Sequence, residues 1–258
     1  MKVSEMTEGL PPKILIYGPP GTGKTAFAMT AGASAQLLDL DKGWTTARSL
    51  KDAFTARRQE VDVLGFYEDD PKKALAFVRC KTKLMEIAEL CYQGKYPFKV
   101  LVVDSLTALS EFALRFIMGN SGGIYYPATG ALRPPEIQHW GLAISEVSNF
   151  LLILRSLPIA VVLIAHSHRD QMVEAGGNKQ DIIEVAVFGK NLPSKVPAYF
   201  DEVLFSKVVE EGGGKRDFVL QTQPTSIVQA RTRSQIPDRY SMRGGLPSLL
   251  ETYYSYKI

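Results

Sequence analysis

Short apolar runs alternate with segments of helical spacing along most of this chain. Each apolar run has the length of a buried strand, and the runs cover residues 13–17, 36–41, 61–67, 99–105 and 158–166. Helical segments are expected between them, at residues 25–29, 70–91, 137–157 and 192–200. Because strands that alternate with helices build parallel sheets, the pattern predicts an α/β fold with a mostly parallel central sheet flanked by helices.

The last two strands follow a different pattern. Residues 202–210 and 216–222 alternate in polarity and are joined by the glycine-rich residues 212–215, which predicts an antiparallel hairpin that extends the sheet. The sequence contains no internal repeat and no linker composition. We therefore expect one domain over residues 1–258, with its core at about 12–238.

The predicted helix at residues 70–91 has its own start signal. Asp70 is a typical N-cap residue. Pro71 suits the first helical position, because the N–H that proline lacks would have no partner there. This pair predicts that the helix begins at Asp70.

Residues 18–25 match the pattern G-x-x-x-x-G-K-[ST] at every fixed position, between an apolar strand and a helical run. Glycines in such a loop let the backbone N–H groups turn toward a phosphate. Lys24 can then reach the β- and γ-phosphates, and Thr25 can ligate a bridging Mg²⁺ ion. The pattern predicts that ATP and Mg²⁺ bind at Gly18, Pro19, Pro20, Gly21, Thr22, Gly23, Lys24, Thr25 and Ala26.

Two other strands end in carboxylates. The strand at 99–105 has four apolar residues followed by Asp104, and a buried carboxylate needs a partner, so Asp104 is the second predicted Mg²⁺ ligand. The strand at 36–41 ends at Asp39 and Asp41. Asp41 is a candidate for orienting or deprotonating the water that attacks the γ-phosphate. It could equally cap the next helix, expected near Trp44, and the sequence leaves both interpretations open.

Composition limits the alternatives without choosing among them. The chain has 258 residues, a net charge of +3 and a pI near 8.7, which permits nucleic acid as a partner but does not require it. Cys80 and Cys91 lack metal-type spacing, so we expect buried thiols in a reducing cytoplasm. The longest apolar segment, residues 159–165, is too short to span a bilayer. We expect a soluble, cytoplasmic protein with no membrane partner.

Two long segments have the composition of functional loops. Residues 118–135 are rich in Gly and Pro and contain Tyr125, Tyr126 and Arg133, which could stack on and pair with single-stranded nucleic acid. An oligomer contact or a mobile flap is the alternative. Residues 169–190 are also expected to form a mobile loop.

Two other groups of residues could contact phosphate. We expect His166, at the end of its strand, to hydrogen-bond the γ-phosphate. A metal site at His166 and His168 is not favoured, since the chain has only one other histidine, His139. Arg231 and Arg233 are two residues apart, so in an extended segment both point to one side and could clamp a phosphate. Their alternative role is a solvated basic edge.

The order of these features resembles the ATPase core of the recombinase RecA over about residues 12–238. The loop at 18–25 and Val102–Val103–Asp104–Ser105 carry most of the likeness, and Arg231–Thr232–Arg233 adds to it. The chain lacks the extra N-terminal helix and the C-terminal domain of the cellular recombinases. In this it is similar to short RecA-like ATPases of bacteriophages, some of which are single-strand annealing proteins.

The resemblance implies roles for particular residues. Asp41 takes the place of the catalytic glutamate, His166 that of the glutamine sensor, and Arg231 and Arg233 that of paired lysines that act on ATP bound to the next subunit. Residues 118–136 and 169–189 take the place of the two DNA-binding loops. This adds three basic candidates for contact with DNA, namely Arg169, Lys179 and Lys190.

The implied protein is a RecA-like P-loop NTPase that hydrolyses ATP slowly and is stimulated by DNA. It would act as a homo-oligomer, ring or filament, on single-stranded DNA in phage-type recombination or annealing, in the host cytoplasm. A single-stranded-DNA-binding protein is a further candidate partner. The alternatives are a nucleotide-gated annealing module with little turnover and a small-molecule kinase.

Overall fold

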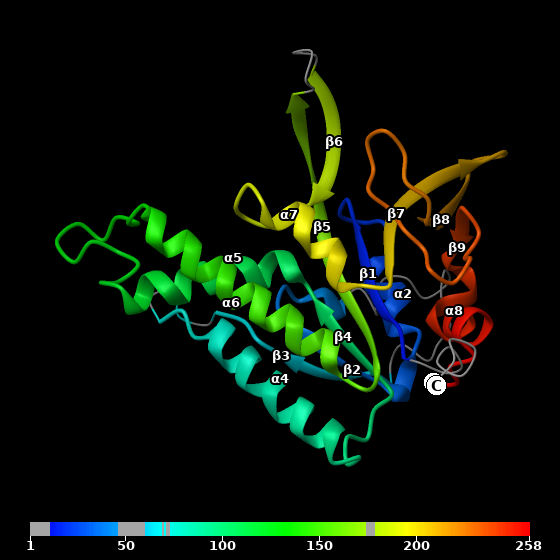
Figure 1. Ribbon diagram of the computed structural model, residues 1–258, viewed down its shortest axis with the longest axis horizontal. Helices are drawn as coiled ribbons and strands as arrows, with labels where there is room; N and C mark the ends of the chain where they lie inside the picture. Colours follow the sequence, from blue (N-terminus) through cyan, green and yellow to red (C-terminus); the bar gives the residue numbers. More distant parts are fainter. Residues whose placement is uncertain (1–10, 46–59, 69, 71–72, 174–178) are drawn as a thin grey trace, which may run out of the picture.

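The apolar runs of the sequence form the centre of one large sheet (Figure 1). The structure is a computed structural model that describes residues 11–45, 60–68, 70, 73–173 and 179–258. Within these residues the strand order is β3-β2-β4-β5-β1-β7-β8-β9, and β6 pairs with β5. The strands are β1 (Lys13–Gly18), β2 (Ala35–Asp39), β3 (Asp62–Gly65), β4 (Val100–Asp104), β5 (Ala160–Val173), β6 (Lys179–Val185), β7 (Glu202–Glu211), β8 (Lys215–Gln221) and β9 (Arg239–Ser241).

The sheet is mostly parallel, as the sequence predicted. The pairs β3–β2, β2–β4, β4–β5, β5–β1 and β1–β7 are parallel. The pairs β7–β8 and β8–β9 are antiparallel, which confirms the C-terminal hairpin. The parallel strands therefore end at one edge of the sheet, where ligands bind in open α/β folds.

Helices cover both faces of the sheet, because alternate residues of each strand point to opposite sides. The helices are α2 (Lys24–Met29), α4 (Ala76–Tyr92), α5 (Leu106–Asn120), α6 (Ile137–Ser156), α7 (Leu192–Lys195) and α8 (Gly245–Tyr254). Leu15 and Tyr17 of β1 pack in the core under α4, α5 and α6, whereas Ile14 and Ile16 pack with α2 and α8. Each such fully buried aliphatic side chain stabilises the fold by about 1.5–3 kcal/mol.

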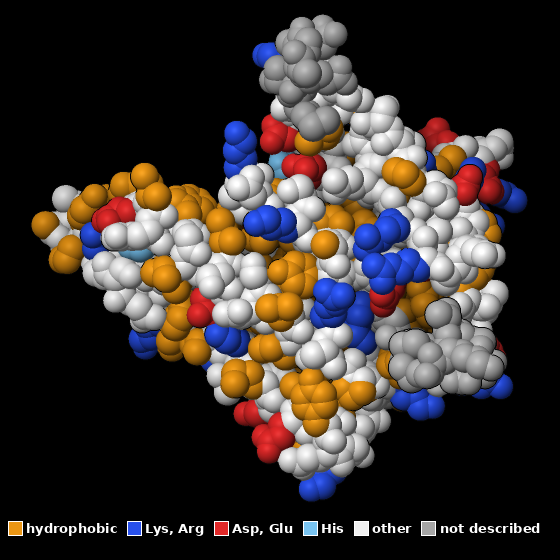
Figure 2. Space-filling model, viewed as in Figure 1, with side chains coloured by type: hydrophobic (Ala, Val, Ile, Leu, Met, Phe, Trp, Pro, Cys, Tyr) orange, Lys and Arg blue, Asp and Glu red, His pale blue; other side chains and the backbone are white. Residues whose placement is uncertain are grey.

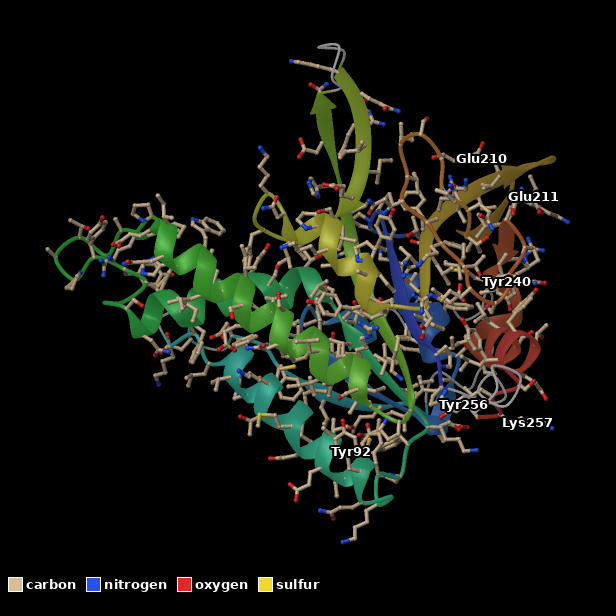
Figure 3. The ribbon with its side chains drawn as sticks, viewed as in Figure 1. Tyr92, Glu210, Glu211, Tyr240, Tyr256 and Lys257 are labelled. Atoms are coloured by element: carbon tan, nitrogen blue, oxygen red, sulfur yellow. The ribbon has the colours of Figure 1, made fainter. Side chains whose placement is uncertain are left out.

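The C-terminal part of the chain adds two elements that the sequence pattern did not predict, β9 and α8. Leu246, Leu249 and Leu250 of α8 are buried in the second core cluster. Tyr256, beyond the helix, donates to Lys99 O at 2.9 Å. Figure 3 shows Tyr240 of β9 and Tyr256 near α8. These contacts bind the end of the chain to the sheet.

The prediction that a helix begins at Asp70 is wrong. Helix α4 begins at Ala76, with Leu75 as its N-cap residue. The Glu68 carboxylate accepts the N–H of Leu75 at 3.1 Å and also the N–H of Ala76, so this side chain satisfies the first free donors of the helix. Pro71 lies outside the described residues.

The prediction of a loop at residues 169–190 is also wrong for residues 169–173 and 179–185, whereas residues 186–190 form no helix or strand. Strand β5 continues past the sheet to Val173 and pairs with β6 in an antiparallel ribbon, from Ser167–Val185 to Val173–Lys179. Figure 1 shows this ribbon projecting from the body of the molecule. Among the described residues, no helix is long and apolar enough to cross a membrane.

Candidate nucleotide-binding site

A cavity of about 560 Å³ lies at the edge where the parallel strands end. It is lined by the loop after β1, the turn after β2, the end of β4 and the part of β5 where its parallel pairing ends. The lining residues are Pro20, Gly21, Thr22, Gly23, Lys24, Thr25, Asp41, Lys42, Gly43, Thr45, Asp104, Ile164 and His166. The structure thus brings together Lys24, Thr25, Asp41, Asp104 and His166, which are far apart in sequence.

The conformation of the loop after β1 depends on its glycines and on one contact to β7. Gly21 and Gly23 have φ of 76° and 82°, in the left-handed region where a side chain is strained. Thr22 Oγ1 donates to Pro19 O at 2.8 Å, and it lies 2.6 Å from Ser206 Oγ, with which it is also hydrogen-bonded. These contacts fix the backbone that is predicted to surround the phosphates.

Lys24 is buried at the centre of this loop. Its ammonium donates to Gly18 O at 2.8 Å and to Pro19 O at 2.7 Å. Burial lowers its pKa to about 8, although the charges of Asp104 and Asp41 oppose this shift. A buried ammonium with only carbonyl acceptors gains from an anion, so a phosphate group suits this position.

Asp104 lies beside the hydroxyl of Thr25, the other Mg²⁺ ligand that the sequence predicted. Thr25 Oγ1 donates to Asp104 Oδ2 at 2.6 Å, and Asp104 is only 2% exposed. Burial, together with the charge of Asp41, raises the pKa of Asp104 to about 7. A buried carboxylate whose ionised form is disfavoured, next to a hydroxyl oxygen, has the oxygen donors that Mg²⁺ prefers. The residues therefore fit the ion.

Asp41 faces His166 across the cavity, with Oδ2 of the carboxylate 3.6 Å from Nε2 of the ring. Burial alone would raise the pKa of Asp41, but hydrogen bonds from His166 and Ser105, together with the His166 charge, hold it below its ordinary value. Asp41 is therefore a carboxylate at neutral pH. It can accept a proton, as the sequence interpretation requires.

Asp39 and Asp41 both contact the turn where the sequence left a capping role open for Asp41, because the N–H of Gly43 interacts with each carboxylate. Gly43 N donates to Asp39 Oδ1 at 2.9 Å and so closes the 3₁₀ turn Gly43–Thr45. The Tyr67 hydroxyl also donates to the Asp39 carboxylate. Residues 46–48, where a longer helix was expected to continue, lie outside the described residues.

Sequence reasoning missed Lys42, Gly43, Thr45 and Ile164 as lining residues. Gly43 is the most constrained of them, since a Cβ atom there would lie 2.5 Å from Asp104 Oδ2 and 3.3 Å from Asp41 Oδ1. The one feature of the sequence that could have indicated Gly43 as a lining residue is its position two residues after Asp41. A glycine that follows a strand end suggests a close backbone approach, but it does not say to which group.

Arg231 and Arg233 lie outside this cavity, beside the beginning of β7. Arg231 pairs through its backbone with Val203, and its guanidinium donates to the carbonyls of Pro197, at 2.9 Å, and Phe200. Arg233 is 57% exposed and forms an ion pair with Asp201 at 3.0 Å. Figure 2 shows Lys and Arg side chains gathered on this face of the molecule, near the junction of α7 and β7.

This position is far from the chain's own phosphate loop. Asp201 N donates to Lys13 O, so this region lies at the first residue of β1, while the loop follows its last residue, Gly18. Five strand steps of about 3.3 Å separate the two ends by roughly 16 Å. Arg233, which pairs with Asp201, is therefore not placed to reach a nucleotide at its own chain's phosphate loop. Arg231 is level with Leu15, about 10 Å from Gly18 along the strand, and its guanidinium is held by the carbonyls of Pro197 and Phe200.

The predicted DNA-contacting side chains differ in solvent exposure and in the contacts that they already make within the chain. Tyr126 is 45% exposed, whereas Tyr125 packs against a small apolar cluster. Arg133 lies over the Tyr126 ring, 5.6 Å from its centroid, and donates to Gly122 O. On the ribbon, Arg169 pairs with Asp181 at 3.7 Å.

Lys179 and Lys190 are both exposed. Figure 1 shows that the ribbon, which begins its second strand at Lys179, and the segment between α5 and α6, which holds Tyr126, project in different directions. Lys190 lies on neither projection, since it follows β6 and its neighbours Phe188 and Gly189 contact Trp140 and Ile144 of α6.

Comparisons with known proteins add the following. A family model described as an AAA domain matches residues 10–234. A search of curated proteins finds no significant match. One similar solved structure comes from a structural and biochemical analysis of a prototypical ATPase from the type III secretion system of pathogenic bacteria, with a TM-score of 0.48 and 16% identity. The match covers 77% of this chain and 51% of that chain, so the chain spans about half the length of that ATPase.

Proposed function

Since the chain belongs to the AAA domain family and has a P-loop ATPase core, we propose that it hydrolyses ATP with Mg²⁺ and acts as an oligomer on single-stranded DNA, in recombination or annealing of the bacteriophage type. The observation that carries the ATPase part is the cavity that joins Lys24, Thr25, Asp104 and Asp41. Cation, hydroxyl and carboxylates are the groups that phosphoryl transfer requires.

Lys24 and the two Mg²⁺ ligands have roles that follow from their contacts. Lys24 exchanges its two carbonyl acceptors for the β- and γ-phosphates. Thr25 and Asp104 would hold the ion, and the Thr25 hydroxyl would then give up its present hydrogen bond to the carboxylate. When bound, Mg²⁺ would supply positive charge that stabilises the transition state of phosphoryl transfer.

Asp41 acts on the attacking water. It is ionised at neutral pH, and its position opposite His166 keeps the carboxylate turned toward the cavity. Asp41 orients the water and accepts its proton, while His166 contacts the γ-phosphate and reports its presence to β5. The lowered pKa keeps the Asp41 carboxylate ionised and able to accept a hydrogen bond from the water, but it also makes Asp41 a weaker base, so orienting the water is the larger part of this role.

A neighbouring subunit completes the site with one arginine. Arg233 is the candidate, because an exposed ion pair such as Arg233–Asp201 contributes only about 0–1 kcal/mol and is easily released. Arg231 is not equivalent, since its removal would leave the carbonyls of Pro197 and Phe200 without their donor. An arginine supplied by a neighbour raises the rate of related enzymes by about 10³–10⁵.

Mixing two inactive variants tests the shared site. Lys24→Ala lacks a functional P-loop and Arg233→Ala lacks the trans arginine, so each alone should hydrolyse ATP poorly, yet their mixture should recover activity. Arg239→Ala is the matched control, an exposed arginine whose partners Glu211 and Asp217 lie on β7 and β8. Figure 3 shows Glu211 far out on the β7–β8 hairpin. Full activity of Arg233→Ala alone would refute the trans role.

The DNA part of the proposal rests on exposed aromatic and basic side chains, mainly Tyr126, Lys179 and Lys190. ATPase rates measured with and without single-stranded DNA separate the candidate functions. Stimulation by DNA supports a DNA-dependent ATPase. ATP-dependent DNA binding without turnover would instead identify a nucleotide-gated annealing module, and transfer of phosphate to a small molecule would identify a kinase.

A further inference from the structure

The ribbon formed by β5 and β6 carries three metal-ligating side chains on one face. His168 on β5 lies directly opposite Glu184 on β6, and Asp170 follows His168 by two residues, so all three point to the same side. One ligand atom from each residue lies within 4.8 Å of the other two. Figure 2 shows a histidine and acidic side chains gathered on the ribbon.

Within the described residues, each of these side chains has either few hydrogen-bond partners or an unfavourable electrostatic environment. Nδ1 of His168 is buried and has no hydrogen-bond partner there. Glu184 is half-buried, and burial raises its pKa, an effect that His168 reduces and Asp170 increases. Asp170 Oδ1 accepts only the neighbouring N–H of Gln171, at 2.7 Å. A shared cation would relieve the repulsion between the carboxylates and provide a partner for the ring.

We propose that His168, Asp170 and Glu184 bind one divalent transition-metal ion, with Zn²⁺ as the first candidate, and that this ion fastens β5 to β6. One imidazole nitrogen and two carboxylate oxygens form a ligand set that Zn²⁺ accepts. The imidazole disfavours Mg²⁺ and Ca²⁺, which prefer oxygen ligands. Three protein ligands leave a fourth position for water.

The geometry needs only a small adjustment. Ligand atoms that are each about 2.1 Å from a tetrahedral Zn²⁺ ion lie about 3.4 Å apart. The distances between the three ligand atoms, which are now up to 4.8 Å, must therefore become shorter when the ion binds. His168 and Glu184 are fixed opposite each other by backbone pairing, whereas the exposed Asp170 can rotate toward them.

The ribbon has a structural need for such an ion. Beyond the parallel sheet, β5 pairs with β6, and the other edge of β6 contacts residues 226–228, where Ile183 N donates to Ile227 O at 2.6 Å and Gln180 Nε2 donates to Ser226 O at 2.9 Å. Two-stranded ribbons are marginally stable in water. An ion held by both strands would keep them paired, and it would lie two residues beyond His166 of the nucleotide cavity.

Metal titration of the full chain tests the proposal. Chelator-treated protein is titrated with Zn²⁺ in competition with a chromophoric indicator, with Mg²⁺ in excess to occupy the P-loop position. We expect one Zn²⁺ per chain, and at least tenfold weaker binding in both His168→Ala and Glu184→Gln, since even the loss of a group that only supports a ligand costs about 10–100-fold. Asp181→Asn is the matched control, a carboxylate on the opposite face of the same strand, and should bind as the parent does.

Two further measurements keep the result interpretable if one variant folds poorly. The visible spectrum of bound Co²⁺ should change in Glu184→Gln, because its ligand set has changed. Zn²⁺ should slow tryptic cleavage after Arg169 in the parent but not in either ligand variant. Absence of Zn²⁺ binding by the parent would overturn the proposal, as would equal binding by both ligand variants. Binding that is lost only in Asp104→Asn would place the ion in the nucleotide cavity instead and equally overturn it, without affecting the proposed ATPase function.

Discussion

Gly43→Ala tests the position of the Mg²⁺ site through a contact that the structure defines. A Cβ atom at residue 43 would lie 2.5 Å from Asp104 Oδ2 and 3.3 Å from its Cγ. Real Cβ atoms do not make contacts under 3.0 Å, so the carboxylate or the turn must move by about 0.5 Å, the difference between 2.5 and 3.0 Å. Asp104 is buried, and its Oδ2 already accepts from Thr25, so it has little room to move.

The size of the effect follows from the cost of overpacking, which is about 1–3 kcal/mol. If Mg²⁺ must bind a carboxylate displaced by this amount, the affinity for Mg-ATP should fall by about 5- to 150-fold. Binding of ATP without Mg²⁺ should change less, because the three atoms nearest the new methyl group belong to Asp104 and Asp41 and not to Lys24 or the loop backbone. The substitution therefore separates the ion's contribution from that of the phosphate loop.

Titration of a fluorescent ATP analogue with and without Mg²⁺ measures both quantities. Gly141→Ala is the matched control, since Gly141 lies in helix α6 and a Cβ atom there would have no neighbouring atom within 4 Å. It should leave both affinities unchanged. A folded Gly43→Ala protein with the parent's Mg²⁺-dependent affinity would refute the assignment of Asp104 as an Mg²⁺ ligand.

Three further predictions concern single side chains. Burial raises the pKa of Asp104 from 3.8 to about 7, so its ionisation destabilises the nucleotide-free fold progressively as the pH rises from about 4 to about 7, and the whole penalty is present above pH 7. Asp104→Asn should therefore raise the melting temperature at pH 8 but not at pH 4, and no gain at pH 8 in differential scanning fluorimetry would contradict this. Asp41→Asn should slow hydrolysis by about 10²–10⁴-fold with nearly unchanged ATP affinity, and unchanged turnover would exclude Asp41 as the base. Tyr126→Ala should weaken single-stranded DNA binding by about 1–3 kcal/mol in anisotropy titrations, and the parent's affinity should fall steeply with salt; equal affinity of parent and variant would remove Tyr126 from the DNA surface.

The parts of the site that the sequence predicted share one physical basis. Each ends or follows a buried parallel strand or, for His166, lies where the parallel pairing of its strand ends, and these ends converge at one edge of the sheet. Lys24, Thr25, Asp41, Asp104 and His166 could therefore be brought together without knowledge of any tertiary contact. The local sequence pattern was sufficient to predict this part of the site, because each apolar strand and the polar residues that follow it lie within about ten residues of one another.

The features that the sequence could not predict depend on contacts between distant residues. Nothing near Arg231 indicates that its guanidinium turns toward carbonyls about 30 residues earlier. The cap of α4 likewise comes from Glu68, which lies outside the usual N-cap spacing, and this displaced the start from Asp70. Contacts between distant residues determine both the orientation of the Arg231 guanidinium and the cap of α4, because several polar groups can compete for the same backbone partner.

The ribbon was missed for a different reason. Residues 167–171 are polar on both sides, so they lack the alternation of apolar and polar positions that predicts a strand. Their pairing is determined by β5, which enters the ribbon already extended from the buried sheet. A strand that begins as a core element can continue into solvent without any signal of its own in the sequence.

Strand β5 also connects the nucleotide cavity to the ribbon at a single residue. The His166 side chain lines the cavity opposite Asp41, while its carbonyl accepts from Ala186 N, just after β6, at 2.8 Å. A displacement of His166 by a bound γ-phosphate would therefore move both strands of the ribbon together. Coupling of this kind is reciprocal in binding free energy. Any ligand that prefers one position of the ribbon must change the affinity for nucleotide by the same factor by which the nucleotide changes the affinity for that ligand.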